Sequence, residues 1–246
     1  MPTNLKFRSW LEYEIECIFA NGGSGGITRA LPDRANFYAM LCNGNITDVS
    51  TKASVIAAEI EKTTTNNYNR FNAPLATEAI YDAGNKRWQM PVVTWTVSYP
   101  EAIQYNSVVL MAEARVDSNK PVTITPGQPA IFAVSDSHGL AQDEELMITP
   151  DTSGTLPSGL DGTKIYYMFS YVSATEFQIS ELSPGDPNRV ALDLTAAGSD
   201  LILRYAKGRL VGFRREDSVE TLAANAPRSF NFFIANAAGF GVGAGS

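Results

Sequence analysis

The sequence has little of what enzymes and metal centres are usually built from. It contains one histidine, His138, and two cysteines, Cys17 and Cys42, in 246 residues. Histidine is the most frequent general base near neutral pH, and a zinc site usually needs three or four His, Cys or acidic ligands. The cysteines lack CxxC spacing and are too few for a disulfide framework, so we interpret them as small apolar residues in a reducing compartment. We therefore expect a protein that is not an enzyme and that holds no cofactor and no metal.

Charge is also scarce. Charged residues make up 18% of the chain, and 26 acidic residues against 19 basic ones give a net charge of −7. Nucleic-acid binding needs clustered cations that neutralise phosphates, so this balance argues against a nucleic-acid partner. No apolar run reaches the roughly 18–20 residues of a membrane span, and the first residues show no signal-peptide pattern. We expect a protein without a membrane partner that is made in the cytoplasm.

What the sequence does contain is enough apolar material for a packed core, at 44% of the chain. In the first part, apolar residues at helical spacing predict helices over residues 5–19 and 53–62. Strands are predicted at residues 36–41, 93–97 and 108–114. Residues 63–72 have no period and are interpreted as a polar loop.

The second part begins after a short polar stretch ending in proline, residues 117–121, which is the clearest candidate domain boundary. Short strands are predicted beyond it, at residues 122–125, 130–134, 145–149, 164–172, 176–180 and 190–194. Turns rich in Gly and Pro separate them at regular spacing, which is typical of a small all-β sandwich or barrel. Further strands are predicted at residues 201–205, 210–214 and 230–234.

Four short motifs contain residue types used in catalysis or metal binding, and each has a simpler explanation. Ser24 lies in a G-x-S-x-G match, but a nucleophile elbow needs a preceding strand, so a flexible linker is favoured. The string Asp151-Thr152-Ser153-Gly154 resembles an aspartyl-protease triplet without its second copy, which favours a turn. Residues 135–138 contain triad residue types, but a loop histidine that caps backbone groups is favoured. Residues 143–145 could hold a hard cation, yet a solvated loop is favoured.

Aromatic residues gather on one predicted strand. Strict alternation places Tyr167, Phe169 and Tyr171 on one face of this strand and Tyr166 on the other. An aromatic stripe of this kind can stack against sugar rings, which makes Tyr167 and Tyr171 candidate glycan contacts. Packing in a hydrophobic core is the favoured interpretation.

Three features of the middle segment stand out as a set. They are the turn His138-Gly139-Leu140, a hairpin string from residue 154 to residue 167 (G-T-L-P-S-G-L followed by G-T-K-I-Y-Y), and the closing strand F-Q-I-S at residues 177–180. Together they resemble a small β module inserted in structural proteins of tailed bacteriophages. The resemblance covers about a third of the chain, roughly residues 121–203.

The flanking segments resemble, more weakly, an attachment domain of phage tail fibres or tail tips. The similar features are residues 36–44, the element Tyr68-Asn69-Arg70, and the closing strands at residues 210–213 and 230–234. The resemblance implies a host domain of residues 1–117 and 205–246 interrupted by an inserted module at residues 118–204. The expected fold is mainly β, with a β-sandwich-like host domain, an N-terminal helix and an inserted small all-β domain.

The same resemblance implies a function. We expect a non-enzymatic structural component of a tailed-phage virion, in the tail, the baseplate or the tail-fibre attachment region, assembled in the host cytoplasm. Its partners would be other virion proteins and further copies of itself. Two alternatives stay open, a capsid decoration or cement protein and a glycan-binding receptor-recognition module that uses the aromatic strand or the loop at residues 63–72.

The two ends of the chain are the predicted protein contacts. Trp10 and Leu11 lie in the predicted N-terminal helix, and Phe240 and Val242 lie in an apolar, Gly-rich tail. Terminal segments are poorly ordered unless something holds them in place, and large symmetric assemblies often use them as contacts. These four residues are therefore candidates for contacts with neighbouring subunits.

Overall fold

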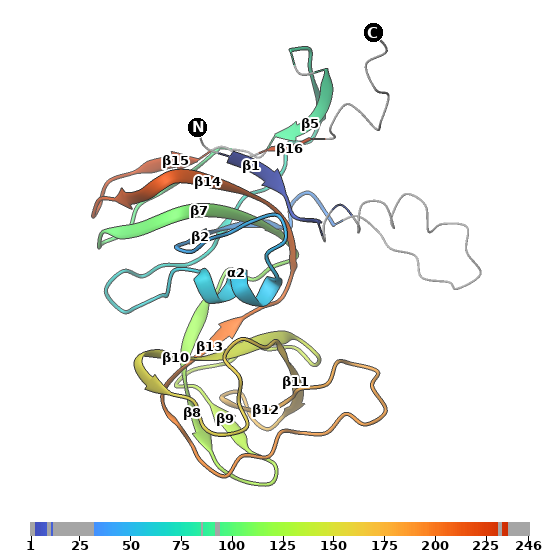
Figure 1. Ribbon diagram of the computed structural model, residues 1–246, viewed down its shortest axis with the longest axis vertical. Coiled ribbons are helices and arrows are strands. Elements are labelled where there is room, and N and C mark those ends of the chain that lie inside the picture. The colour runs from blue at the N-terminus through green and yellow to red at the C-terminus, as the bar shows by residue number, and fades with distance from the viewer. Residues whose placement is uncertain are drawn as a thin grey trace, which may run out of the picture.

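The computed structural model describes residues 3–8, 11, 32–84, 86–91, 94–230 and 233–235 of the chain. These residues form sixteen strands and one short helix, so the prediction of a mainly-β fold is confirmed. Figure 1 shows a large sheet in the upper half of the view and a barrel in the lower half, with the helix between them.

The elements before the barrel are β1 (Thr3–Lys6), β2 (Phe37–Cys42), α2 (Lys52–Ala58), β3 (Phe71–Asn72), β4 (Ile80–Asp82), β5 (Arg87–Pro91), β6 (Trp95–Val97) and β7 (Ile103–Ala112). The barrel contains β8 (Asn119–Thr125), β9 (Ile131–Ala133), β10 (Glu145–Thr155), β11 (Tyr166–Tyr171), β12 (Glu176–Ser180) and β13 (Ser199–Tyr205). The chain then continues through β14 (Arg209–Leu222), β15 (Arg228–Phe230) and β16 (Phe233–Ala235).

The large sheet has the order β1-β14-β7-β2-β3, with every neighbouring pair antiparallel. Its centre is β7, where six consecutive residues from Ser107 to Ala112 are buried. A strand that is buried at every position is covered on both faces, which explains its nearly continuous apolar sequence. The helix α2 contributes Val55 and Ile56 to the core of this sheet. Thr51 caps the N-terminus of this helix, because its hydroxyl accepts a hydrogen bond from the Ser54 N–H at 3.2 Å.

The barrel closes in the order β10-β11-β12-β9-β8-β13 and has a hydrophobic core of its own. Alternate residues of its strands point inward, including Phe132 and Phe177, whose ring centroids lie 5.8 Å apart. All six barrel strands fall between β7 and β14, which pair with each other in the large sheet. The division of the chain into separately folding units stays a prediction.

Two smaller sheets complete the fold. In the first, β6 pairs with β15, and the rings of Trp95 and Phe230 meet edge to face at 4.6 Å. Phe230 also approaches Tyr105 of β7, so this pair packs against the large sheet. The second has the order β16-β5-β4, and its β4–β5 hairpin projects from the body at the top of Figure 1.

Several element predictions need correction. The helix predicted from residue 5 cannot begin there, because Leu5 and Lys6 pair with β14 in the large sheet; residues 12–19 lie outside the described residues. The helix predicted to residue 62 ends earlier, since Glu59 is extended at φ −62° and ψ 140°. The strand predicted at residues 190–194 is wrong, because its only ladder contact among the described residues is a bridge from Leu194 to Gly127.

Candidate functional site

The sheet and the barrel meet around a buried ion pair. Glu59 follows α2, and Arg70 lies just before β3. The Arg70 Nε donates to Glu59 Oε1 at 2.8 Å and its Nη2 donates to Glu59 Oε2 at 2.7 Å, while both side chains are almost fully excluded from solvent. Tyr68 donates its hydroxyl hydrogen to the same carboxylate at 3.3 Å and accepts a hydrogen bond from the Leu41 N–H at 2.9 Å. The element Tyr68-Asn69-Arg70 is therefore part of the interior.

This ion pair also holds the barrel strand β13. Arg70 Nη2 donates to the Tyr205 carbonyl at 2.7 Å, and Arg204 Nη1 donates to the Glu59 carbonyl at 3.2 Å. Arg204 additionally bonds Thr149 on β10 at 3.0 Å. Charge-assisted hydrogen bonds with bidentate geometry fix orientation as well as distance. The barrel is thus held in one orientation against the sheet. The interpretation of residues 63–72 as a polar loop is wrong for Tyr68 and Arg70, which are buried, and for Phe71–Asn72, which form β3.

A second set of contacts surrounds the His138-Gly139-Leu140 turn. Arg115, in the segment between β7 and β8, donates to the Gly139 carbonyl at 2.6 Å and to Glu144 at 2.8 Å. Its guanidinium lies 4.4 Å from the centre of the Tyr205 ring, and the Tyr205 hydroxyl donates to the His138 carbonyl at 2.7 Å. Burial raises the pKa of Tyr205. The phenol stays neutral and serves as a hydrogen-bond donor to the turn.

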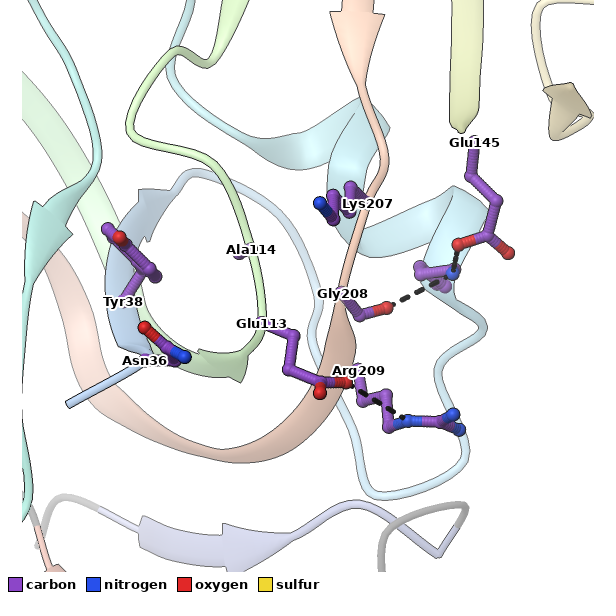
Figure 2. Close-up of a pocket in the computed structure, with 9 residues that line it drawn as sticks. Asn36, Tyr38, Glu113, Ala114, Glu145, Lys207, Gly208 and Arg209 are labelled. Atoms are coloured by element: carbon purple, nitrogen blue, oxygen red, sulfur yellow. Dashed lines mark hydrogen bonds and ion pairs between the residues drawn. The ribbon is translucent and has the colours of Figure 1, made fainter. Parts of the chain in front are cut away.

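Beside this junction lies a pocket of about 570 Å³, formed where the two chain segments that connect the sheet and the barrel run past each other. Figure 2 shows Asn36, which precedes β2, and Tyr38 of β2 on one side of the pocket and Glu145 of the barrel on the other. The first residue of α2 and the crossover segments at residues 113–114 and 207–209 complete the wall. The pocket therefore uses residues from both halves of the fold.

The pocket is lined by three cations and two carboxylates. Lys52 forms an ion pair with Glu145 and donates to the Gly208 carbonyl at 3.1 Å. Burial lowers the pKa of Lys52, while the Glu145 carboxylate acts in the opposite direction. Arg209 and Glu113 form a looser pair at 3.7 Å, with both side chains half exposed. Lys207 supplies the third cation.

Comparisons with known protein families, with characterised proteins and with solved structures find no match. The functional argument therefore rests on the residues and the geometry of this chain. Among the described residues, no group of three or more His, Cys, Asp or Glu side chains is placed to hold a metal ion. The described part of the chain also has no helix that combines the length and the apolar character needed to cross a membrane.

The three acidic residues at 143–145 are each neutralised by a different base. Asp143 pairs with Arg189, Glu144 with Arg115, and Glu145 with Lys52. Their carboxylates consequently join different segments of the chain. Glu144 is also buried, so the interpretation of this stretch as a solvated loop is wrong.

The structure accounts for the other catalytic-looking motifs in simple terms. His138 caps backbone groups as predicted, since its Nδ1 accepts from the Leu140 N–H at 2.9 Å and its Nε2 contacts the Ser173 carbonyl at 3.0 Å. Asp151 lies within β10, where the register against β13 shifts between residues 150 and 155, so the predicted loop turn is wrong. Ser24 and Cys17 lie outside the described residues. Cys42 is buried, and burial raises the pKa of its thiol.

Most of the predicted protein contacts cannot be placed. Trp10, Phe240 and Val242 lie outside the described residues. Leu11 is 42% exposed, and its N–H donates to the Phe7 carbonyl at 3.2 Å.

The prediction that the aromatic side chains of β11 share one face is wrong. A register shift between Met168 and Ser170 breaks the alternation, so Tyr167 and Tyr171 do not share a face. Tyr171 pairs with the core residue Phe177, lies at the end of the barrel beside His138 and is 60% exposed. Tyr167 is half-buried on the other face. Neither ring is in the barrel core, so the favoured core-packing interpretation is also wrong for them.

Sequence reasoning missed an exposed aromatic pair. Tyr81 on β4 and Trp88 on β5 are cross-strand partners with ring centroids 5.4 Å apart, and they are 53% and 58% exposed. The turn Asp82-Ala83-Gly84 between them is a usable hairpin signal, because short hairpins favour Asp and Gly in their turns. The pocket residues carried no such signal, since they come from five separate stretches of sequence.

Proposed function

We propose that this chain is a non-enzymatic structural component of a tailed-phage virion, located in the tail, the baseplate or the tail-fibre attachment region, and that it acts through protein–protein contacts. The resemblance of residues 36–44 and of Tyr68-Asn69-Arg70 to attachment domains favours the tail. The observation that carries the contact role is the projecting β4–β5 hairpin.

The hairpin exposes apolar side chains to solvent, which does not stabilise a free monomer. Ile80, Tyr81 and Trp88 are each about half exposed on one short projection. Tyr81 and Trp88 lie side by side on one face of the hairpin; exposed apolar groups of this kind mark interaction sites, and aromatic residues are enriched at the centres of protein interfaces.

The proposal is tested in assembled particles. We expect the chain to keep a constant ratio to the major structural proteins through successive gradient purifications of the phage that encodes it. Particles made with Trp88→Ser should contain less of the chain, whereas Val190→Ser should not reduce its content. Val190 is the matched control because it is an apolar residue, 67% exposed, outside the hairpin. Loss of the wild-type chain on purification, or equal incorporation of the two variants, would contradict the proposal.

Exposed aromatic rings also stack on sugars, so a glycan-binding module is the second candidate function. The Tyr81–Trp88 pair fits this role better than Tyr167 and Tyr171, which lie on different faces. Binding on a glycan array that is lost in Trp88→Ser but kept in Val190→Ser would favour the glycan-binding function over the structural one.

A further inference from the structure

We infer that the pocket between sheet and barrel binds a single carboxylate, supplied by an acidic side chain of a partner protein. This inference rests on the proposed function and adds the chemistry of the partner. Three observations carry it: the net charge of the pocket, the donors it leaves available, and its size.

The charge of the pocket selects a monoanion. Three cations, Lys52, Lys207 and Arg209, face two carboxylates, Glu113 and Glu145, which leaves one net positive charge in a chain whose net charge is −7. A carboxylate neutralises that excess. A phosphate dianion would leave the site negative and would be repelled by both glutamates at short range.

The pocket also has hydrogen-bond donors to offer. Lys207 is exposed and forms no hydrogen bond or ion pair with any described residue. A lysine ammonium has three donors, and Lys52 directs them at Glu145 and the Gly208 carbonyl, which leaves one. Lys207 and Lys52 therefore both offer N–H donors to an incoming carboxylate.

The size of the pocket fits a whole side chain better than a bare ion. Its volume of about 570 Å³ lies within the range of sites that enclose organic ligands. Tyr38 lines the pocket on the side opposite Glu145, as Figure 2 shows, so its ring can contact the methylene groups of a glutamate. The site is preformed, because Gly208 packs closely against the segment at residues 112–114.

The test is a titration of the full ¹⁵N-labelled chain with the capped peptide acetyl-Gly-Glu-Gly-amide, followed by NMR at the amides of Ala114, Gly208 and Arg209. We expect saturable shifts with a Kd on the order of 1 mM. The neutral Gly-Gln-Gly peptide should bind at least about tenfold more weakly, and inorganic phosphate should also bind more weakly than the Glu peptide.

Two lysine variants make the assignment specific. Lys207→Gln should weaken binding of the Glu peptide by about fivefold or more, and Lys86→Gln should leave it unchanged. Lys86 is a matched control, because it is an exposed lysine on the β4–β5 hairpin that likewise forms no ion pair with any described residue. Retained thermal unfolding midpoints would show that both variants are folded.

Any of three results would overturn the inference: no saturable shift at these amides, tighter binding of phosphate than of the Glu peptide, or equal binding by Lys207→Gln and wild type. These outcomes are separate from the particle experiment. If the chain is incorporated into particles but does not bind the peptide, only the carboxylate site is contradicted. If it binds the peptide but is absent from particles, the carboxylate site holds and the virion function is contradicted.

Discussion

Replacing Glu59 by glutamine removes one charge from the buried pair while keeping the volume of the side chain. The Arg70 guanidinium then has no carboxylate to pair with. Its side chain is fully buried, and its Nη1 already lacks a hydrogen-bond partner. Leaving a buried charge uncompensated typically costs ~3–5 kcal/mol. The free energy of unfolding should fall by that amount, a large part of the ~5–15 kcal/mol of a typical domain.

Urea unfolding followed by circular dichroism measures the loss. With an m-value of ~2–3 kcal/mol/M, the midpoint of Glu59→Gln should drop by about 1–2.5 M urea. The double variant Glu59→Gln/Arg70→Met removes both charges, so it should be more stable than Glu59→Gln alone. Lys164→Gln breaks the exposed pair with Glu181 and should leave the midpoint unchanged.

The pair also links two halves of the fold through the Tyr205 carbonyl. We therefore expect tryptic cleavage within the segments that join the sheet to the barrel to be faster in Glu59→Gln than in wild type. A midpoint within error of wild type, or a double variant less stable than Glu59→Gln, would refute the reasoning that this charge pair holds the junction.

Three further predictions concern single groups. Gly208 has φ +111°, and a Cβ there would lie 2.7 Å from a β7 carbonyl oxygen, so Gly208→Ala should lower the free energy of unfolding by about 2 kcal/mol or more. Gly185→Ala is the control, because Gly185 has φ +91° but open space around it, and it should lower the free energy of unfolding less in the same urea assay. Burial raises the pKa of Tyr68, Tyr99 and Tyr205, and only the unfolded chain ionises them near pH 10, so stability should fall by ~4 kcal/mol between pH 9 and pH 11; a flat profile would contradict the neutral buried phenols. The Cys42 thiol should react with a thiol reagent only in urea, because it is buried and its pKa is raised. The measurement uses a variant in which the other cysteine is replaced, and reaction of Cys42 in the folded protein would show that its thiol is accessible.

Local patterns predicted much of the strand structure because short strands and turns depend on neighbouring residues. The strand over residues 176–180 has its predicted bounds in β12, and residues 201–205 lie within β13. A sandwich or barrel was expected from the spacing of the strands, and the structure has a closed barrel. The register shift in β11 could not be predicted, because an inserted bulge leaves no period in the sequence; it separated Tyr167 from Tyr171.

The junction and the pocket were beyond sequence reasoning for a different reason. A charged residue is predicted to be exposed unless its partner is known. The partners of Arg70 are distant in sequence, since Glu59 precedes it by 11 positions and Tyr205 follows it by 135. Two cations of the pocket, Lys52 and Lys207, are likewise far apart in sequence. They lie close together because β7 pairs with both β2 and β14, which brings α2 near the segment that precedes β14.

The location of the protein in assembled particles tests the central proposal most directly. Gold-labelled antibody against the barrel, imaged by electron microscopy on intact phage particles, should mark the tail, its baseplate or the fibre attachment region. Labels on the head would contradict the tail assignment and favour the capsid decoration alternative. Particles that carry no label, although the antibody recognises the folded protein in solution, would contradict a structural role in the virion.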